Sequence, residues 1–198
     1  MEFGTLRVTY DERILRPRPW TAQQSRWAAE LLAGSAPAGP VLELCSGAGH
    51  IGLLAIALQP RALVCVDRSP VACAFARSNA AEAGLAHLVQ VRESSLEAAL
   101  APGEHFAVIL ADPPWVPSRR TATFPEDPLE AIDGGPDGLD VARACLRVAA
   151  SHLLPGGSLL LQLGGHDQVA TLARELDGLV VSETRDGDGG VLVRLTAA

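Results

Sequence analysis

The sequence predicts an α/β protein with a mostly parallel, seven-stranded sheet and helices on both faces of it. Two observations indicate this fold class. From residue 40 onward, short apolar runs alternate with segments of helical periodicity, a pattern typical of parallel sheets that helices cover on both sides. Near the end of the chain, two apolar runs flank a glycine-rich turn, which predicts a C-terminal antiparallel hairpin.

The first half of the alternation supplies three strands and two helices. Ser69 is the expected N-cap of the second helix and Gly84 its stop, because serine side chains cap helix starts and glycine accepts the backbone conformation found at helix ends. In chain order, the predicted elements are strand 39–45, helix 49–58, strand 62–67, helix 69–84 and strand 87–93.

The second half supplies the rest of the sheet. A short helix is expected at residues 95–100, and a long helix at 137–154 is expected to close at the Pro-Gly-Gly of 155–157. The remaining predicted elements are strand 105–112, strand 158–164, helix 167–178 and the hairpin strands 179–183 and 191–196. The hairpin adds one antiparallel strand at or near an edge of the sheet.

Residues 1–38 differ from the rest of the chain. They hold Trp20, Trp27, a cluster of arginine and proline at 16–19 and one expected helix at roughly 21–33. We expect them to form an arm and helix packed on the core. Residues 39–198 are expected to form one cofactor-binding domain, since 198 residues is an ordinary length for a single domain.

Composition narrows the functional classes. The net charge of −7 gives no global reason to bind nucleic acid, although a local pair such as Arg119-Arg120 can suffice. No apolar run approaches the roughly 20 residues of a membrane span, and the first residues lack the apolar centre of a signal peptide. We therefore expect a cytoplasmic protein. The cysteines form no CxxC pair and the histidines no HExxH spacing, so no metal is expected.

Three polar segments directly follow predicted strands, at residues 44–50, 65–69 and 110–115. Open parallel sheets bind ligands outside the carboxyl ends of their strands. We therefore expect these three segments to meet in one crevice, although they lie far apart in the sequence.

Residues 47–52 match the GxGxxG pattern, and Asp67 ends the next strand. This is the dinucleotide fingerprint, so a nicotinamide cofactor is one interpretation. Glu43 opposes it, because a carboxylate before the loop disfavours a pyrophosphate at the helix start. S-adenosylmethionine, with an ammonium, a ribose and no phosphate, fits better. Asp67 can accept both ribose hydroxyls, and Glu43 can balance the amino group, through water or by shaping the loop.

Several spaced motifs resemble a known family. VLELCSGAGHIGLLAIAL and VDRSPVACAFARSNAAEAGL resemble the first two motifs of class I methyltransferases. DPPWVPS, then EAIDGGPDGLD and a helix ending in LLPGG, is similar to the HemK/PrmC protein-glutamine methyltransferases that act on release factors, whose rim reads NPPY. LRPRPWTAQ is similar to the IPRPETE segment of that family, so that the resemblance covers roughly residues 14–165.

The resemblance implies a Rossmann-like class I methyltransferase fold and S-adenosylmethionine as cofactor. The cofactor-binding residues that it implies are Glu43, Cys45, Ser46, Gly47, Gly49, Asp67, Arg68 and Ser95. Cys45 replaces the first glycine of the usual loop, and Ser95 stands where relatives carry an acid for the adenine amino group. The separate N-terminal helical domain of the family, which helps to recognise the release factor, has no counterpart in the residues before the cofactor fold.

The rim Asp112-Pro113-Pro114-Trp115 holds the candidate catalytic residues. In methyl transfer the acceptor lone pair must lie roughly 3 Å from the methyl carbon. We expect the Asp112 carboxylate and the Pro113 carbonyl to accept the N–H groups of a planar nitrogen, with Pro114 fixing the backbone and Trp115 as a flat wall. The long loop 113–136, here called the flap, is expected to cover the substrate.

The acceptor stays open between three classes. Overall resemblance favours a protein glutamine amide. The aspartate of the rim favours an adenine amino group of RNA or DNA, because an ionised carboxylate only accepts hydrogen bonds whereas an asparagine also donates. The compact, acidic chain is compatible with a small nitrogenous metabolite. A non-catalytic binding subunit with the cofactor fold is the alternative from another class.

Overall fold

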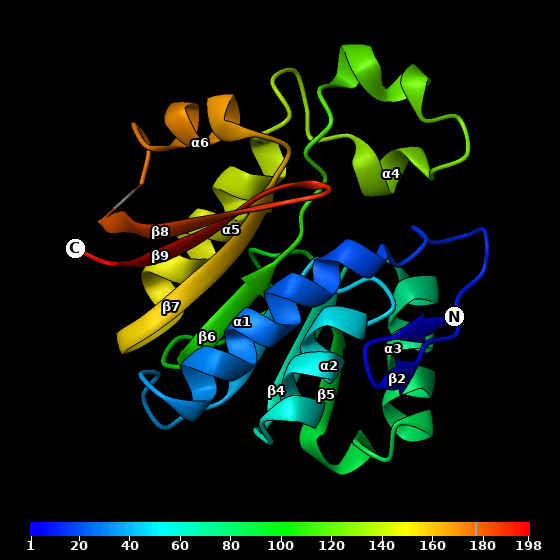
Figure 1. Cartoon of the computed structure of the whole chain (residues 1–198), viewed down its shortest axis with the longest axis vertical. Helices are drawn as coiled ribbons and strands as arrows, with labels where there is room; N and C mark the ends of the chain where they lie inside the picture. The colour runs from blue at the N-terminus through cyan, green and yellow to red at the C-terminus, as the bar shows by residue number, and fades with distance from the viewer. Residues whose placement is uncertain (177) are drawn as a thin grey trace.

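The computed structural model describes residues 1–176 and 178–198, and its centre is a seven-stranded sheet (Figure 1). The order across the sheet is β5-β4-β3-β6-β7-β9-β8. β9 runs antiparallel to both of its neighbours, and the remaining neighbouring pairs are parallel. The strands are β3 (Val41–Leu44), β4 (Leu63–Asp67), β5 (Val89–Glu93), β6 (Phe106–Ala111), β7 (Leu153–Leu163), β8 (Leu179–Gly187) and β9 (Gly190–Ala197). The predicted fold class is confirmed.

Helices cover both faces of the sheet. On one face, α1 (Ala22–Ala33), α2 (His50–Leu58) and α3 (Pro70–Glu82) pack over one hydrophobic cluster. On the other face, α5 (Asp140–His152) and α6 (His166–Leu172) pack over a second cluster. The central strands β3 and β6 are buried along their whole length, as expected for parallel strands between two helical layers.

The N-terminal residues lie against the same core. A short antiparallel pair, β1 (Glu2–Phe3) and β2 (Leu6–Arg7), precedes a 3₁₀ turn, η1 (Pro19–Thr21), and α1. Trp27 of α1 is only 1% exposed, and the guanidinium carbon of Arg185 lies 4.0 Å from the centre of its ring. The division of the chain at residue 38 stays a prediction.

Three local predictions are corrected. Residues 95–100 form a turn instead of a helix, because so short a segment cannot offset the cost of helix nucleation without packing. β7 begins at Leu153, before the Pro-Gly-Gly, and a register shift between Phe106 and Val108 of β6 absorbs the extra residues. The helix expected at 167–178 ends at Leu172, and its residue Asp177 lies outside the described residues.

The flap is more ordered than its sequence predicts. It holds a 3₁₀ turn, η3 (Ser118–Thr123), and a short helix, α4 (Leu129–Ile132). Another 3₁₀ turn, η2 (Ala86–Leu88), lies outside the flap, just before β5. Val116 N–H donates to the Ile132 carbonyl at 3.0 Å, and Gly134 N–H to the Val116 carbonyl at 2.9 Å. These bonds close the flap at its base. In the part of the chain described, no helix is long and apolar enough to span a membrane.

Candidate functional site

Three strand ends meet at one edge of the sheet. β4, β3 and β6 are parallel neighbours, so Asp67, the loop after Leu44 and Asp112 emerge at the same edge. Burial raises the pKa of Glu43 most, and the nearby Asp112 and Asp67 carboxyl groups raise it further. The predicted convergence of the three segments is confirmed.

The glycine loop depends on left-handed backbone. Gly47 and Gly49 have φ of 51° and 75°, which glycine adopts at little steric cost. Among the described residues, no atom beyond its two chain neighbours lies within 4 Å of the position that a Cβ on Gly47 would occupy, so the loop is open there. A Cβ on Gly49 would lie 3.1 Å from the Ala76 Cβ of α3. Gly49 therefore permits close packing of α3, while Gly47 leaves room for a ligand.

Asp67 ties this loop to the end of β4. Its Oδ2 accepts the Gly47 N–H at 2.8 Å, and its Oδ1 accepts the Ser69 N–H at 2.9 Å. A carboxylate has about four acceptor positions, so each oxygen keeps capacity for a further donor. Ser69 also caps α3, because its hydroxyl accepts the Ala72 N–H at 3.2 Å. The predicted cap is confirmed, and the ribose contact of Asp67 stays a prediction.

Glu43 lies beneath the loop and is only 2% exposed. Its Oε2 accepts a hydrogen bond from the Cys65 thiol at 3.4 Å. Its Oε1 has no partner within the described residues. Burial raises its pKa to about 8. Gly52, the third glycine of the GxGxxG pattern, makes room for Glu43, since a Cβ there would lie 2.5 Å from Oε2.

The remaining predicted cofactor residues take different places around the loop. Cys45 is half-buried and has a φ of 55°; the neighbouring Cys145 thiol and burial raise its pKa. The Ser46 side chain is buried, and its hydroxyl has no partner among the residues described. Arg68 donates to the Glu130 carbonyl of the flap at 3.2 Å. Ser95 is exposed in the turn after β5.

The rim follows β6 directly. Asp112 is half-buried, and burial raises its pKa to about 7. Within residues 1–176 and 178–198, no donor of the chain bonds its carboxylate. Pro113 is buried, while Pro114 and Trp115 are half-buried. Asp112 therefore offers an unpaired carboxyl group at the sheet edge, on backbone that two prolines stiffen.

Sequence reasoning missed two glutamines at this edge. Gln24 of α1 is 1% exposed, and its Nε2 donates to the carbonyls of Ala111 and Leu160 at 3.1 and 2.9 Å. Gln168 of α6 bonds the backbone of Trp115 and of Gly164. A polar residue within an otherwise apolar helix stripe is the signal that could have indicated Gln24. A cavity of about 320 Å³ also lies beside Trp115, between the flap and α6.

S-adenosylmethionine fits the residues present. The backbone at Gly47 is open, and Asp67 retains acceptor capacity beside it. Acids stand at or just after the ends of β3, β4 and β6. A bound ammonium or sulfonium would favour their ionised forms, whereas a pyrophosphate would oppose them. Across the described residues no cluster of three or more histidine, cysteine or acidic side chains could hold a metal.

Solved structures share the fold of this chain. The hMettl16 catalytic domain, in complex with MAT2A 3'UTR hairpin 1, has a TM-score of 0.75 at 16% identity and covers 100% of this chain and 75% of that chain. The ribosomal protein L11 methylase from Lactobacillus delbrueckii subsp. bulgaricus has a TM-score of 0.68 at 14% identity, over 94% and 83% of the two chains. The chain has the fold of class I methyltransferases.

Sequence comparison is more specific. Residues 10–124 match the family model described as Conserved hypothetical protein 95. The release factor glutamine methyltransferase of Cereibacter sphaeroides is 38% identical over 97% of this chain and 70% of its own length. That of Deinococcus radiodurans is 41% identical over 89% and 63%. The ribosomal protein uL3 glutamine methyltransferase of Bradyrhizobium diazoefficiens is 36% identical over 91% and 60%.

The chain belongs to the HemK/PrmC protein-glutamine methyltransferase family. It spans about three fifths of the length of the Deinococcus and Bradyrhizobium relatives.

Proposed function

We propose that this chain is an S-adenosylmethionine-dependent N-methyltransferase that acts on the side-chain amide of a glutamine in a protein. The observation that carries the proposal is the unpaired carboxyl group of Asp112 beside the open glycine loop. The names of the relatives support the acceptor class. A cytoplasmic location belongs to the proposal, since release factors and ribosomal proteins act there.

The cofactor would supply an electrophilic methyl group on a sulfonium. The Gly47 loop and Asp67 would hold it at the ends of β3 and β4. Asp112 and the Pro113 carbonyl would accept the amide N–H groups, which orients the nitrogen lone pair and stabilises the positive charge that develops on it. The Trp115 ring would bound the planar amide on one side.

The raised pKa of Asp112 bears on the choice of acceptor. At a pKa of about 7, much of the carboxyl group is protonated at neutral pH. A protonated carboxyl both donates and accepts, so it can bond the C=O and the N–H of one amide, as the asparagine of an NPPY rim can. The DPPW rim is thereby compatible with a glutamine acceptor.

An adenine amino group is the second candidate, because an ionised Asp112 only accepts hydrogen bonds. The test is to incubate the protein with methyl-labelled cofactor and separated protein, RNA and small-molecule fractions of a bacterial lysate. We expect the label in protein, recovered as N5-methylglutamine after proteolysis. Label found solely in RNA, or in small molecules alone, would overturn the glutamine assignment.

Cofactor binding is tested separately by calorimetry with S-adenosylhomocysteine. We expect saturable binding, and the Asp67→Ala variant should bind more weakly because the carboxylate that ties Gly47 to Ser69 is lost. A folded sample that does not bind at millimolar ligand would remove the methyltransferase proposal as a whole.

A further inference from the structure

The Trp115 ring lies against a glycine at the end of β7. If Gly164 had a Cβ, it would lie 2.6 Å from Cε3 and 3.0 Å from Cζ3 of the indole. The side chain is half-buried, so one part of the ring is covered by backbone while another part faces the cavity beside it. The direction of the ring is therefore set by the relative position of the Trp115 and Gly164 backbones.

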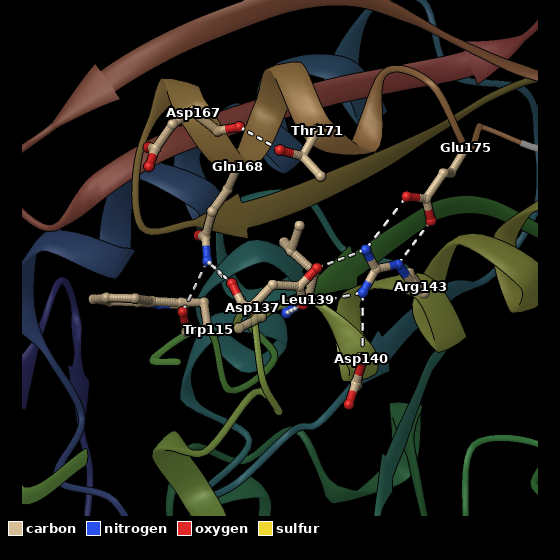
Figure 2. A network of polar contacts seen from close by, with 10 residues as sticks. Trp115, Asp137, Leu139, Asp140, Arg143, Asp167, Gln168, Thr171 and Glu175 are labelled. Atoms are coloured by element: carbon tan, nitrogen blue, oxygen red, sulfur yellow. Dashed lines mark hydrogen bonds and ion pairs between the residues drawn. The ribbon is translucent and has the colours of Figure 1, made fainter. Parts of the chain in front are cut away.

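One side chain fixes both of these backbones. Gln168 Nε2 donates to the Trp115 carbonyl at 2.9 Å (Figure 2), and the Gly164 N–H donates to Gln168 Oε1 at 2.8 Å. The orientation of the amide is not ambiguous, because a backbone N–H can only donate and a carbonyl can only accept. Gln168 thus provides a partner for the Gly164 N–H at the end of β7 and for the Trp115 carbonyl of the rim.

The same amide also reaches the base of the flap. Its Nε2 lies 3.4 Å from the Asp137 carbonyl and 3.5 Å from the Gly138 carbonyl. Gly138 has a φ of 83°, and a Cβ there would be 2.7 Å from Gln168 Nε2. The turn at 137–138 can approach Gln168 this closely only because it carries a glycine.

An ion network anchors this turn to the rest of the fold. Arg143 of α5 bonds Asp137 Oδ2 at 2.8 Å and Glu175 Oε2 at 2.7 Å, as Figure 2 shows. Asp137 also accepts the Leu139 N–H at 3.0 Å. Gln168 therefore binds Trp115 to a turn that is held from α5 and from the segment after α6.

We propose that Gln168 is a positioning residue that sets the plane of Trp115 against the methyl acceptor. The inference rests on the proposed function for its catalytic consequence, and on geometry alone for the placement of the ring. It extends the site from the rim to α6, a helix that follows β7 and contributes no candidate catalytic residue.

The informative substitution is Gln168→Glu. An ionised carboxylate can still accept the Gly164 N–H, but it faces the carbonyl oxygens of Trp115, Asp137 and Gly138 and has no proton to give them. Protonation of the introduced carboxyl restores one donor, and the facing carbonyl oxygens raise its pKa above the ordinary value of about 4.3. We therefore expect a defect at pH 8 that is relieved as the pH is lowered toward 5. Gln168→Met, which cannot donate at any pH, should show the defect throughout this range.

Placement of the ring is measured without any acceptor. The protein contains three tryptophans, so labelling with 5-fluorotryptophan gives three fluorine resonances, and Trp115→Phe identifies the one from Trp115. In Gln168→Glu at pH 8 and in Gln168→Met, that resonance should shift or broaden while the Trp27 resonance stays. An unchanged Trp115 resonance in both variants would overturn the inference, whatever the enzyme activity proves to be.

The kinetic arm uses the glutamine substrate found for the wild type. Relative to wild type at each pH, Gln168→Glu should lower kcat by about tenfold or more at pH 8, because small misplacements of a reacting group cost that much, and should recover as the pH is lowered toward 5. Affinity for S-adenosylhomocysteine should stay within about twofold. Loss of cofactor affinity and kcat together, without recovery toward pH 5, would show that Gln168 is only structural.

The matched control is Gln59→Glu, which introduces the same charge at the C-terminal end of α2. It should leave the Trp115 resonance and the rate unchanged. If wild type transfers no methyl group to any glutamine, the proposed function fails and the fluorine spectra still decide whether Gln168 places the ring.

Discussion

Arg18 of the N-terminal arm bonds Asp127 of the flap, with its Nη2 2.7 Å from Oδ1 and 2.6 Å from Oδ2. The Asp127 side chain is only 7% exposed and that of Arg18 is 34% exposed. Arg68, next to Asp67, bonds the Glu130 carbonyl of the same flap. Figure 1 shows the flap with α4 standing over the end of the sheet where α1 begins. The flap is thus held by Arg18 of the N-terminal arm and by Arg68, which directly follows β4.

Arg18→Ala is expected to loosen the flap and to destabilise the protein. The substitution leaves a nearly buried Asp127 carboxylate without its charged partner, and such a loss costs about 1–3 kcal/mol of unfolding free energy. Urea denaturation measures the loss, and amide hydrogen exchange should show faster exchange within residues 117–136.

Arg13→Ala is the control, because Arg13 pairs with Asp11 at a solvent-exposed position, where pairs contribute about 0–1 kcal/mol. Equal effects of the two substitutions on stability and on exchange in the flap would contradict a holding role for Arg18.

Most of the fold could be predicted from the sequence, because it depends on periodicity and on glycine and proline at element ends. The alternating runs gave the strands of the sheet, and Ser69 gave the start of α3. The Leu153 start of β7 could not be predicted, because the irregular pairing with β6 is a tertiary contact. The short β1–β2 pair was missed for the same reason, since two-residue strands carry no periodicity.

The site was predictable as far as it follows from strand ends. Glu43, Asp67 and Asp112 were placed at one edge because parallel neighbours end together. Their surroundings were not predictable. The burial that raises the pKa of Asp112 and the contact of Gly52 with Glu43 depend on helix packing, and the role of Gln168 depends on two loops that meet only in the folded chain.

The contact between Gly52 and Glu43 predicts a strong coupling between these positions. Gly52→Ala places a Cβ 2.5 Å from Glu43 Oε2 and 3.0 Å from the methyl groups of Leu63, and such overpacking costs about 1–3 kcal/mol. In a Glu43→Ala background the same substitution should cost less, with a coupling energy of about 0.5 kcal/mol or more from a double-mutant cycle of unfolding. Gly34→Ala is the control, because its Cβ would have one neighbour at 3.4 Å. If the losses of unfolding free energy from Glu43→Ala and Gly52→Ala simply add in the double variant, the contact is refuted.

Glu43 should also make stability depend on pH. Its pKa rises from 4.5 to about 8 on folding, so the folded state favours the protonated form. The stabilisation is fully present below pH 4.5 and is lost as the pH rises toward 8, by at most about 1.4 kcal/mol per pH unit. Asp112 titrates in part of this window and must be held constant. The unfolding free energy is therefore measured against pH for two cofactor-free proteins, the Asp112→Asn variant and the Asp112→Asn/Glu43→Gln double variant. Parallel curves of unfolding free energy against pH would show that Glu43 does not titrate there.

Asp112 is expected to act in methyl transfer in its protonated form. Its pKa of about 7 lies within the working range of an assay. If the protonated form bonds the glutamine amide, kcat/KM should be level below pH 7 and should fall about tenfold per pH unit above it. Asp112→Asn, which donates and accepts at every pH, should remain active with a flat profile over this range.

Asp112→Ala should lose transfer by about a hundredfold or more while it still binds S-adenosylhomocysteine. The opposite profile, with kcat/KM rising through pH 7 and an inactive Asp112→Asn, would mean that the ionised carboxylate is the working form. That outcome would favour an acceptor that offers only N–H donors, such as an adenine amino group. The protonation state of Asp112 that supports transfer would therefore distinguish the two acceptor classes.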